Sequence, residues 1–312
     1  MPVSVLLQFR MKTYSSQTAF TRLVREARCL YSNHSRLAGE RVSNYIRTLG
    51  EMEQLIQSRF GVAVQDLDVL DIGPGQFLVH LTYFARNNRV VGIDLDVIAR
   101  GFHLTPYVQM FRFNGARRTI KTLVRKAVGI DARYESEMRR QMSLNSLPQV
   151  RVNQMDACQI TFPADSFDFV HSRSVFHHLP DPGAAIGHVS RILRPGGIAY
   201  LSFHLYTSAN GSLDPRIFGQ KQEAIGLWPH LRAGLQGQIN GNAFVNRLRL
   251  ADWRKLFGDK MSGVQLILNR NSRITAEADV RRLKSDGELA EYTLEELLTD
   301  EVVVLWRKPI SS

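Results

Sequence analysis

Cysteine is scarce in this sequence, and long apolar runs are absent. Only two of the 312 residues are cysteine, Cys29 and Cys158. Two thiols cannot form a disulfide framework, so the sequence excludes a disulfide-stapled secreted domain and indicates a reducing compartment such as the cytoplasm. No window approaches the roughly 20 apolar residues of a transmembrane helix. Residues 1–7 have a short apolar run with no basic region before it, so we do not expect a signal peptide.

Acidic residues are also in short supply. The chain has 29 acidic residues against 40 lysines and arginines, which gives a formal net charge of +11. This excess indicates an anionic partner or surface and says little about the fold. No set of histidines, cysteines and carboxylates has the spacing of a structural zinc site, so no metal is predicted. The sequence has no internal repeat, and its length allows one large core with an accessory element.

Three strand-like segments that end in glycine or aspartate are the main positive signal. The apolar runs at residues 69–72, 90–93 and 150–155 lead into Gly73, Asp94 and Asp156. This pattern predicts parallel strands of a doubly wound α/β sheet whose carboxyl ends hold a nucleoside-containing cofactor. Glycine lets the backbone approach the ligand, and a carboxylate accepts hydrogen bonds from ribose hydroxyls.

The glycine-rich turn lacks the third glycine of a dinucleotide-binding fingerprint. That fingerprint reads G-x-G-x-x-G, whereas Gly73 and Gly75 are followed by Leu78 at the third position. Asp71 would repel a pyrophosphate but attract an ammonium group. S-Adenosylmethionine carries an ammonium group and a ribose diol but no phosphate. These residues therefore favour S-adenosylmethionine over NAD as the cofactor.

Six motifs in order carry a resemblance to a known family. They are Asp71-x-Gly73-x-Gly75, Asp94, Met155-Asp156-Ala157, Phe167-Asp168-Phe169-Val170, His177-His178-Leu179-Pro180-Asp181-Pro182 and Leu193-Arg194-Pro195-Gly196-Gly197. Over roughly residues 66–205 the chain resembles the class I S-adenosylmethionine-dependent methyltransferases, in the branch that acts on sugars, quinones and natural products. Phe77 departs from the family, which has glycine there. We expect the first helix to pack less closely, with the cofactor displaced or covered by the ring.

The resemblance implies a set of cofactor-binding residues, which are Asp71, Gly73, Gly75, Asp94, Leu95, Asp156, Ala157 and Ser172. Asp94 would bind the ribose hydroxyls, and Asp156 would lie beside the adenine amino group. The plain alternative for these aspartates is that they cap strand ends or turns. Asp168 is expected to bond backbone near Gly73, and Asp181 to cap a helix.

The resemblance also implies one catalytic residue, His177. Some sugar O-methyltransferases have a catalytic histidine at this position, and a neutral imidazole is a suitable base for a hydroxyl acceptor at pH 7. Such enzymes can have an orienting carboxylate at the end of the fifth strand, where this sequence has Phe203 followed by His204. The missing acid leaves two interpretations of His177, as a general base and as part of a structural loop.

Together these patterns predict a Rossmann-like doubly wound sheet of seven strands with an antiparallel last strand, N-terminal helices and helical insertions that form a cap. We expect a helical cap at residues 1–65 and a methyltransferase domain at residues 66–312, with insertions at about 101–147 and 205–249. Strands are expected at residues 69–72, 89–94, 149–155, 167–172, 198–204, 264–269 and 302–307. Helices are expected at residues 16–30, 42–56, 76–86, 183–193 and 250–257. Gly61 is expected to end the second of these helices, and residues 194–197 are expected to form a turn.

Residues 112–140 concentrate positive charge, with nine basic and three acidic side chains. Ile120, Leu123, Val124 and Val128 recur in this segment at helical spacing, which predicts a basic amphipathic helix. Such a helix suits an anionic membrane surface, an acidic substrate or RNA. The plain alternative is a solvated helix that serves as a lid.

The predicted function is methyl transfer from S-adenosylmethionine to a small-molecule acceptor, preferably a hydroxyl on a sugar, glycolipid or secondary metabolite. The expected location is cytoplasmic, with peripheral attachment to a membrane as an option. A nucleic-acid methyltransferase is disfavoured, because the site of its usual Pro-Pro-aromatic motif reads Ser172-Arg173-Ser174-Val175-Phe176. A non-catalytic cofactor-binding protein is the other alternative, suggested by Phe77 and Phe203.

Overall fold

The computed structural model describes residues 37–101, 104–218, 226–241, 243–270 and 277–310. The helix expected at residues 16–30 and Cys29 lie outside these ranges. No helix of the described residues is long and apolar enough to cross a membrane.

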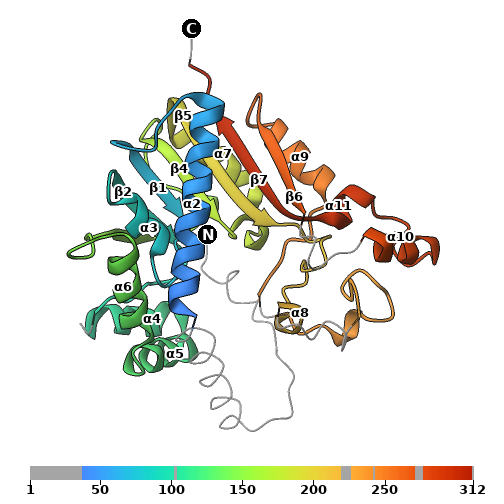
Figure 1. Ribbon diagram of the computed structural model, residues 1–312, viewed down its shortest axis with the longest axis horizontal. Helices are drawn as coiled ribbons and strands as arrows, with labels where there is room; N and C mark the ends of the chain where they lie inside the picture. The colour runs from blue at the N-terminus through green and yellow to red at the C-terminus, as the bar shows by residue number, and fades with distance from the viewer. Residues whose placement is uncertain (1–36, 102–103, 219–225, 242, 271–276, 311–312) are drawn as a thin grey trace, which may run out of the picture.

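A seven-stranded sheet forms the centre of the described chain (Figure 1). Its strands are β1 (Asp68–Ile72), β2 (Arg89–Asp94), β3 (Arg151–Gln154), β4 (Phe167–Arg173), β5 (Leu193–His204), β6 (Gln265–Arg270) and β7 (Thr299–Arg307). The order is β3-β2-β1-β4-β5-β7-β6. Pairing is parallel from β3 to β5, and β7 is antiparallel to both of its neighbours. The expected doubly wound sheet with an antiparallel last strand is confirmed.

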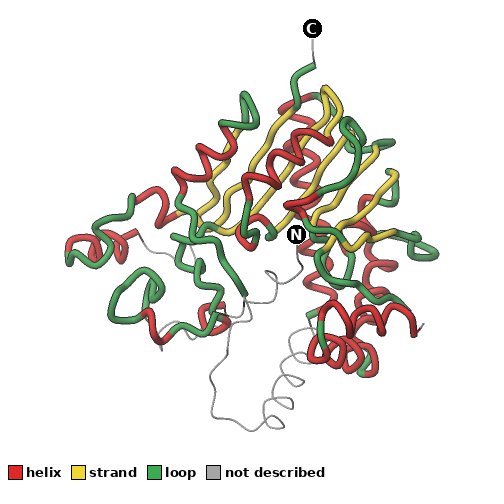
Figure 2. Tube along the Cα trace, turned by 180° about the vertical axis from the view of Figure 1, so that it is seen from behind, coloured by secondary structure: helices red, strands yellow, loops and turns green. Residues whose placement is uncertain are grey.

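Helices cover both faces of the sheet (Figures 1 and 2). One face carries α2 (Ala38–Phe60), α3 (Val79–Phe84) and α6 (Ile130–Gln141), and the other carries α7 (Pro182–Ile192) and α9 (Leu250–Gly258). Successive side chains of a strand point to opposite faces, so β1 contributes to both cores. Val69 packs in the core beneath α2, whereas Leu70 and Ile72 pack in the core beneath α7 and α9.

A third, smaller core lies beside the sheet. It joins the segment after β5 to α10 (Glu277–Ser285) and α11 (Leu294–Leu298). Trp228 is fully buried there, and its indole nitrogen donates a hydrogen bond to the carbonyl of Thr207 at 3.1 Å. The second insertion, which also contains the short helix α8 (Pro215–Phe218), is therefore anchored to the C-terminal part of the chain.

The helix before the sheet ends where the sequence predicted. α2 stops at Gly61, which adopts φ 66° and whose amide donates to the carbonyl of Gln57. Its buried side chains, among them Val42, Leu49 and Ile56, pack with Val69 and Phe169 of the sheet. α2 thus completes one of the two main cores.

The first helix after β1 is shorter than expected. It was expected at residues 76–86, but α3 begins only at Val79 because Leu78 adopts a left-handed conformation with φ 55°. A side chain at positive φ cannot continue a right-handed helix. Gly75, at φ 71°, adds a second reversal just before it.

The segment at residues 194–197 is part of strand β5, and the prediction of a turn that precedes the strand was wrong. β5 starts at Leu193, and its pairing with β4 shifts register between Phe167 and Phe169. Gly196 adopts φ 82°, its amide donates to the carbonyl of Lys308, and the amide of Lys308 donates to Gly197. The two glycines therefore bend β5 without ending the strand.

The prediction of a single basic helix at residues 112–140 was also wrong. The first insertion forms three helices, α4 (Leu104–Asn114), α5 (Ala116–Ala127) and α6. Gly115 at φ 85° and Gly129 at φ 74° separate them. Glycine adopts these conformations without steric cost, so each glycine is a natural break between helices.

We expect Phe257→Ala to lower the free energy of unfolding by about 3–5 kcal/mol, the usual cost of emptying a large buried aromatic site. Phe257 is fully buried between Phe176, Phe203 and Trp253. Phe244→Ala is the matched control, because its side chain is exposed, and should change stability by about 0.5 kcal/mol or less. Urea unfolding followed by tryptophan fluorescence measures both. Equal losses would contradict this account of the core.

Candidate functional site

Backbone hydrogen bonds hold the carboxyl ends of the first three strands together. The amide of Gly73 donates to the carbonyl of Ile93 at 2.8 Å, and the amide of Met155 donates to the carbonyl of Asp94 at 2.9 Å. The turns after β1, β2 and β3 therefore lie side by side at one edge of the sheet. This places Gly73, Asp94 and Asp156 together, as the sequence pattern requires.

The two glycines of the turn have different surroundings. Both adopt positive φ, 70° at Gly73 and 71° at Gly75. A Cβ on Gly73 would lie 2.3 Å from Cγ2 of Val175, so this glycine allows the loop after β4 to approach. A Cβ on Gly75 would meet nothing within 4 Å. Space therefore remains beside Gly75, where the family places its ligand.

Asp71 lies in a buried polar cluster. Its Oδ1 is 2.7 Å from Nδ1 of His171, and its Oδ2 has no hydrogen-bond partner among the described residues. The ring of His80 packs edge-on against His171, and neither nitrogen of His80 has a partner within the described chain. Burial holds the pKa of His80 well below its usual range, and His171 and Arg173 lower it further. His80 is therefore neutral.

This cluster is the one group in the described residues with the geometry to hold a metal ion. The candidate ligand atoms of Asp71, His80 and His171 all lie within 4.8 Å of one another. It offers only one carboxylate, however, and the Arg173 guanidinium is close enough to disfavour positive charge on His80. A divalent cation would meet that repulsion. The arrangement suits an anionic Asp71 held by imidazole better than a metal centre.

Asp94 is the last residue of β2, and among the described residues one of its carboxylate oxygens accepts a hydrogen bond while the other is available to a ligand. Its Oδ1 accepts a hydrogen bond from the amide of Asp96 at 2.9 Å. Burial raises the pKa of Asp94 to about 6, and the charges of Asp96 and Asp71 act in the same direction. The next side chain, Leu95, is 65% exposed. A buried acceptor beside an exposed apolar side chain suits a ribose diol next to an aromatic base.

The other proposed cofactor residues already have roles in the protein. Asp156 Oδ1 accepts from the amide of Cys158 at 2.8 Å and so caps the 3₁₀ helix η3 (Ala157–Gln159). This is the capping alternative, and it leaves the second oxygen of Asp156 for a ligand. Ala157 is buried at the start of η3. Ser172 donates its hydroxyl to the carbonyl of Ile72 at 3.0 Å, so any contact it makes with a ligand cannot use that donor.

Two other aspartates differ in how well they match their expected positions. Asp181 accepts from the amide of Ala184 and caps α7, as expected. Asp168 does bond backbone, but at the amide of Asp68 and not near Gly73. Arg194 joins both, since its Nη1 lies 2.8 Å from Asp68 and 2.6 Å from Asp168. Asp168 therefore fixes the amino ends of β1 and β4.

Phe77 contacts the first insertion. Its ring stacks on Tyr134 of α6 with centroids 3.7 Å apart, and the guanidinium of Arg125 lies 4.9 Å from the ring centroid. The first insertion thus clamps the loop between Gly75 and α3. The expectation that the cofactor is displaced or covered by the ring of Phe77 stays a prediction.

His177 lies on the short 3₁₀ helix η4 (Phe176–His178) directly after β4. It is almost fully buried, and its Nδ1 has no partner among the described residues. Burial lowers the pKa of His177 to about 2, and the neighbouring His178 and His204 lower it as well. The imidazole is therefore neutral and resists protonation.

A second histidine faces His177 across the site, with ring centroids 5.7 Å apart. This is His204, whose Nδ1 lies 4.0 Å from Oδ2 of Asp300 at the start of β7. The amide of Asn210 donates to Oδ1 of Asp300 at 3.1 Å. Nδ1 of His204 also lies 3.3 Å from the backbone carbonyl of Asp300, so β7 brings both a carbonyl and a carboxylate beside this ring. No local motif marks Asp300, and only the pairing of β5 with β7 reveals it.

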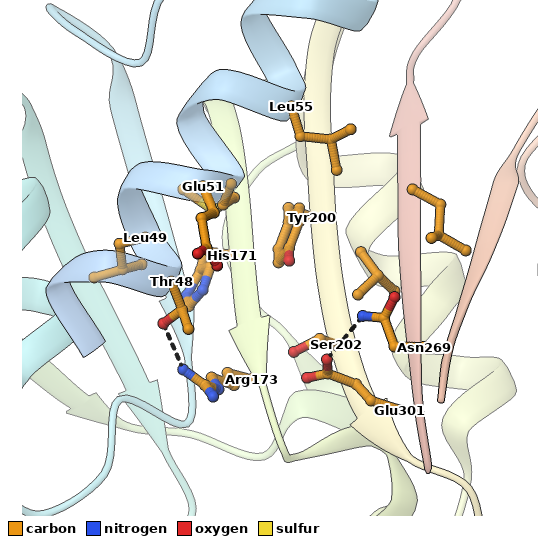
Figure 3. Close-up of a pocket in the computed structure, with 13 residues that line it drawn as sticks. Thr48, Leu49, Glu51, Leu55, His171, Arg173, Tyr200, Ser202, Asn269 and Glu301 are labelled. Carbon is orange, nitrogen blue, oxygen red and sulfur yellow. Dashed lines mark hydrogen bonds between the residues drawn. The ribbon is translucent and has the colours of Figure 1, made fainter. Parts of the chain in front are cut away.

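Figure 3 shows a cavity of about 200 Å³ between α2 and strands β4 to β7. His171, which contacts Asp71, lines one side, and Glu301, the strand partner of His204, lines the other. Both polar and apolar side chains form the wall. Arg173 donates to Thr48 at 2.9 Å, and Asn269 donates to Glu301 at 3.1 Å. The cavity therefore links the Asp71 cluster to the strand pair that carries His204.

The residues at this edge of the sheet suit S-adenosylmethionine. Asp71 has an unpaired buried oxygen, Asp94 keeps one acceptor free, and Gly75 leaves open space. An ammonium group and a ribose diol match the two carboxylates. A pyrophosphate would face the same two negative charges and be repelled.

Comparison with known proteins agrees with this geometry. A family model described as a methyltransferase domain matches residues 44–258. An uncharacterised chloroplastic methyltransferase from Arabidopsis thaliana is 35% identical over 103 residues, which are 33% of this chain and 26% of that protein. The chain thus spans about a quarter of the length of this curated relative.

Solved structures of similar fold have low sequence identity. One is a chain of the Haloferax volcanii complex between the Trm112 methyltransferase activator and a methyltransferase, with TM-score 0.44 and 15% identity over 94% of this chain and 97% of that chain. Another is phosphoethanolamine N-methyltransferase 2 from Haemonchus contortus, with TM-score 0.43 and 17% identity over 83% of this chain and 52% of that chain.

The family model covers well over half of the chain, and the Gly73 turn, Asp94 and Asp156 lie within the match. The cofactor of this family is S-adenosylmethionine. The chain belongs to the methyltransferase domain family, within the class I S-adenosylmethionine-dependent methyltransferases.

Proposed function

We propose that the protein transfers the methyl group of S-adenosylmethionine to a hydroxyl of a small polar acceptor, such as a sugar, a glycolipid or a secondary metabolite. One observation carries the proposal. The polar cavity beneath α2 adjoins the Asp71 cluster through His171 and the His204 strand pair through Glu301. A cavity rich in hydroxyl, amide and charged groups suits a polyol better than an apolar ring.

The two histidines would divide the work of removing the acceptor proton. Methyl transfer from a sulfonium is an in-line displacement, so the hydroxyl must be aligned and its proton accepted. Burial makes His177 a poor proton acceptor, although its neutral ring can hold a hydroxyl by a hydrogen bond. His204 has Asp300 beside it to stabilise an imidazolium. His177 thus positions the hydroxyl and His204 takes the proton.

Two other functions are less well supported. The aromatic rings that favoured a non-catalytic protein have structural roles, since Phe77 stacks on Tyr134 and Phe203 packs 4.2 Å from Trp253 in the core. A nucleic-acid methyltransferase would need a base-binding pocket of stacked aromatics. Tyr200 is the aromatic side chain that lines the described cavity. Methyl release over acceptor pools that include sugars, phenols and transfer RNA would separate these functions.

A reducing compartment such as the cytoplasm is part of this proposal. Cys158 is a free thiol, and burial raises its pKa to about 11, so it is poorly reactive. The name of the plant relative places that protein in the chloroplast.

Asp94→Ala should weaken S-adenosylmethionine binding by roughly 10- to 150-fold, because a charge-assisted hydrogen bond to the ribose contributes about 1.5–3 kcal/mol. Asp165→Ala is the matched control, since Asp165 pairs with Lys308 at the opposite edge and should leave affinity unchanged. Isothermal titration gives both values. Unchanged affinity in Asp94→Ala, or tighter binding of NAD, would contradict the cofactor site.

Cofactor affinity should depend on pH through Asp94. The carboxyl has a raised pKa of about 6, so it is ionised above that pH and protonated below it. Binding that requires the carboxylate should be constant from pH 7 to 8 and weaken by up to about tenfold per pH unit below 6. Titration from pH 5 to 8 measures this, and Asp94→Asn should remove the dependence. A flat profile in the unmodified protein would show that the ionised form is not required.

His204→Ala should lower turnover by about 10²–10⁴-fold, the usual loss of a general base, with cofactor affinity unchanged. Asp300→Asn should lower turnover, because it removes the negative charge beside the imidazolium that forms when His204 takes the proton. His188→Ala on α7 is the control and should behave like the unmodified enzyme. Normal turnover in His204→Ala, with a large loss in His177→Ala, would return the base to His177.

A further inference from the structure

Helices α4 and α5 expose an apolar surface to solvent. Seven of the eleven exposed large apolar side chains in the described chain lie here: Leu104, Val108, Phe111, Phe113, Ile120, Leu123 and Val128, which we call the apolar patch. Leu104, Val108 and Phe111 follow one another at helical spacing and are 80%, 67% and 60% exposed. Isolated exposed apolar residues are normal, but a contiguous set marks an interaction surface.

The orientation of α5 is the reverse of the usual arrangement. Its buried residues are Thr119, Thr122 and Arg125, whereas Ile120 and Leu123 are roughly half exposed. The buried guanidinium of Arg125 pairs with Asp131 at 2.5 Å. Amphipathic helices of globular proteins bury the apolar face and expose the polar one. Here the polar face is satisfied inside the protein, so the apolar face is directed outward.

The chain segment that overlaps the apolar patch is rich in basic residues. Between residues 112 and 140 there are nine basic and three acidic side chains, a local net charge of +6. Arg118 pairs with Asp96, and Arg140 pairs with Glu137, which leaves the segment strongly positive. Figures 1 and 2 show α4 and α5 side by side at the end of the molecule away from the C-terminus.

We propose that this patch docks the protein on an anionic lipid bilayer. Apolar side chains enter the headgroup region while basic side chains meet anionic headgroups, which is the signature of an interfacial helix. A second copy of the chain is disfavoured, because two surfaces of charge +6 would repel each other. RNA would leave the aliphatic side chains of Leu104, Val108 and Leu123 without partners. An anionic bilayer satisfies both the charge and the apolar surface.

Docking would also place the catalytic edge near the lipid. The first insertion connects β2 to β3, so it rises from the carboxyl edge of the sheet where Asp94 and Asp156 lie. Combined with the proposed function, on which this consequence rests, it favours an acceptor whose hydroxyl belongs to a lipid-linked polar head. The docking itself does not depend on the acceptor.

Co-sedimentation of the full chain with vesicles tests the proposal. We expect binding to phosphatidylcholine vesicles that contain about 30% phosphatidylglycerol, and at least tenfold weaker binding to phosphatidylcholine alone. Raising salt from 0.1 to 1 M should weaken the anionic binding, because the Debye length falls from about 10 Å to about 3 Å. Negligible binding to both vesicles in the full chain would overturn the proposal, as would equal binding to both.

Variants separate the patch from general stickiness. Val108→Ser with Phe111→Ser should reduce binding to anionic vesicles about tenfold or more. Phe244→Ser with Ile310→Ser removes two exposed apolar side chains elsewhere and should bind like the unmodified chain. Arg112→Glu should weaken anionic binding only. S-Adenosylmethionine titration reports whether each variant is folded, and equal effects of the two double variants would overturn the proposal.

The vesicle assay contains no catalytic step. If the protein binds anionic vesicles but methylates no polar acceptor, the docking proposal stands and the proposed function is contradicted. If the protein methylates a soluble sugar but does not bind anionic vesicles, the proposed function stands and the docking proposal is contradicted.

Discussion

The site depends on the strand register that brings the carboxyl ends of β1, β2 and β4 to the same edge of the sheet. Ile72 is the strand partner of both Ile93 and Ser172, and the next amide, Gly73, donates to the carbonyl of Ile93. The chain then turns at positive φ, where a side chain on Gly73 would collide with Val175. Backbone geometry therefore fixes the loops. The carboxylates proposed to bind the cofactor take their positions from the strands, before any side-chain contact is considered.

Much of the fold could be predicted because it depends on local patterns. Apolar runs gave the strands to within a few residues at most ends, and Gly61 ended α2 as expected. The failures lie where the backbone contradicts the local pattern. Leu78 adopts a left-handed conformation that favours glycine, so its sequence gave no sign that α3 would start late. Gly115 and Gly129 looked tolerable inside a helix, since one glycine costs only about 1 kcal/mol there.

Asp300, the carboxylate proposed to support His204, shows why part of the site could not be predicted. A strand places alternate side chains on opposite faces, so Phe203 and His204 must diverge. Phe203 packs into the core against Trp253, while His204 faces its partner strand and Asp300. Asp300 is 96 residues away in sequence and enters through the antiparallel pairing of β5 with β7. A search for an acid at the end of β5 could not find it, because the acid belongs to another strand.

The reversed α5 is the remaining feature that the contacts among the described residues do not explain. Exposing apolar area forgoes about 25 cal/mol per Å² of burial, and placing Arg125 inside requires Asp131 to neutralise it. Both costs fall on the same helix, whereas rotating the pattern by half a turn would remove them. They are offset only when something covers the outer face. Because the segment is also strongly basic, the covering surface must be apolar and anionic together, and a bilayer with anionic lipids has both properties.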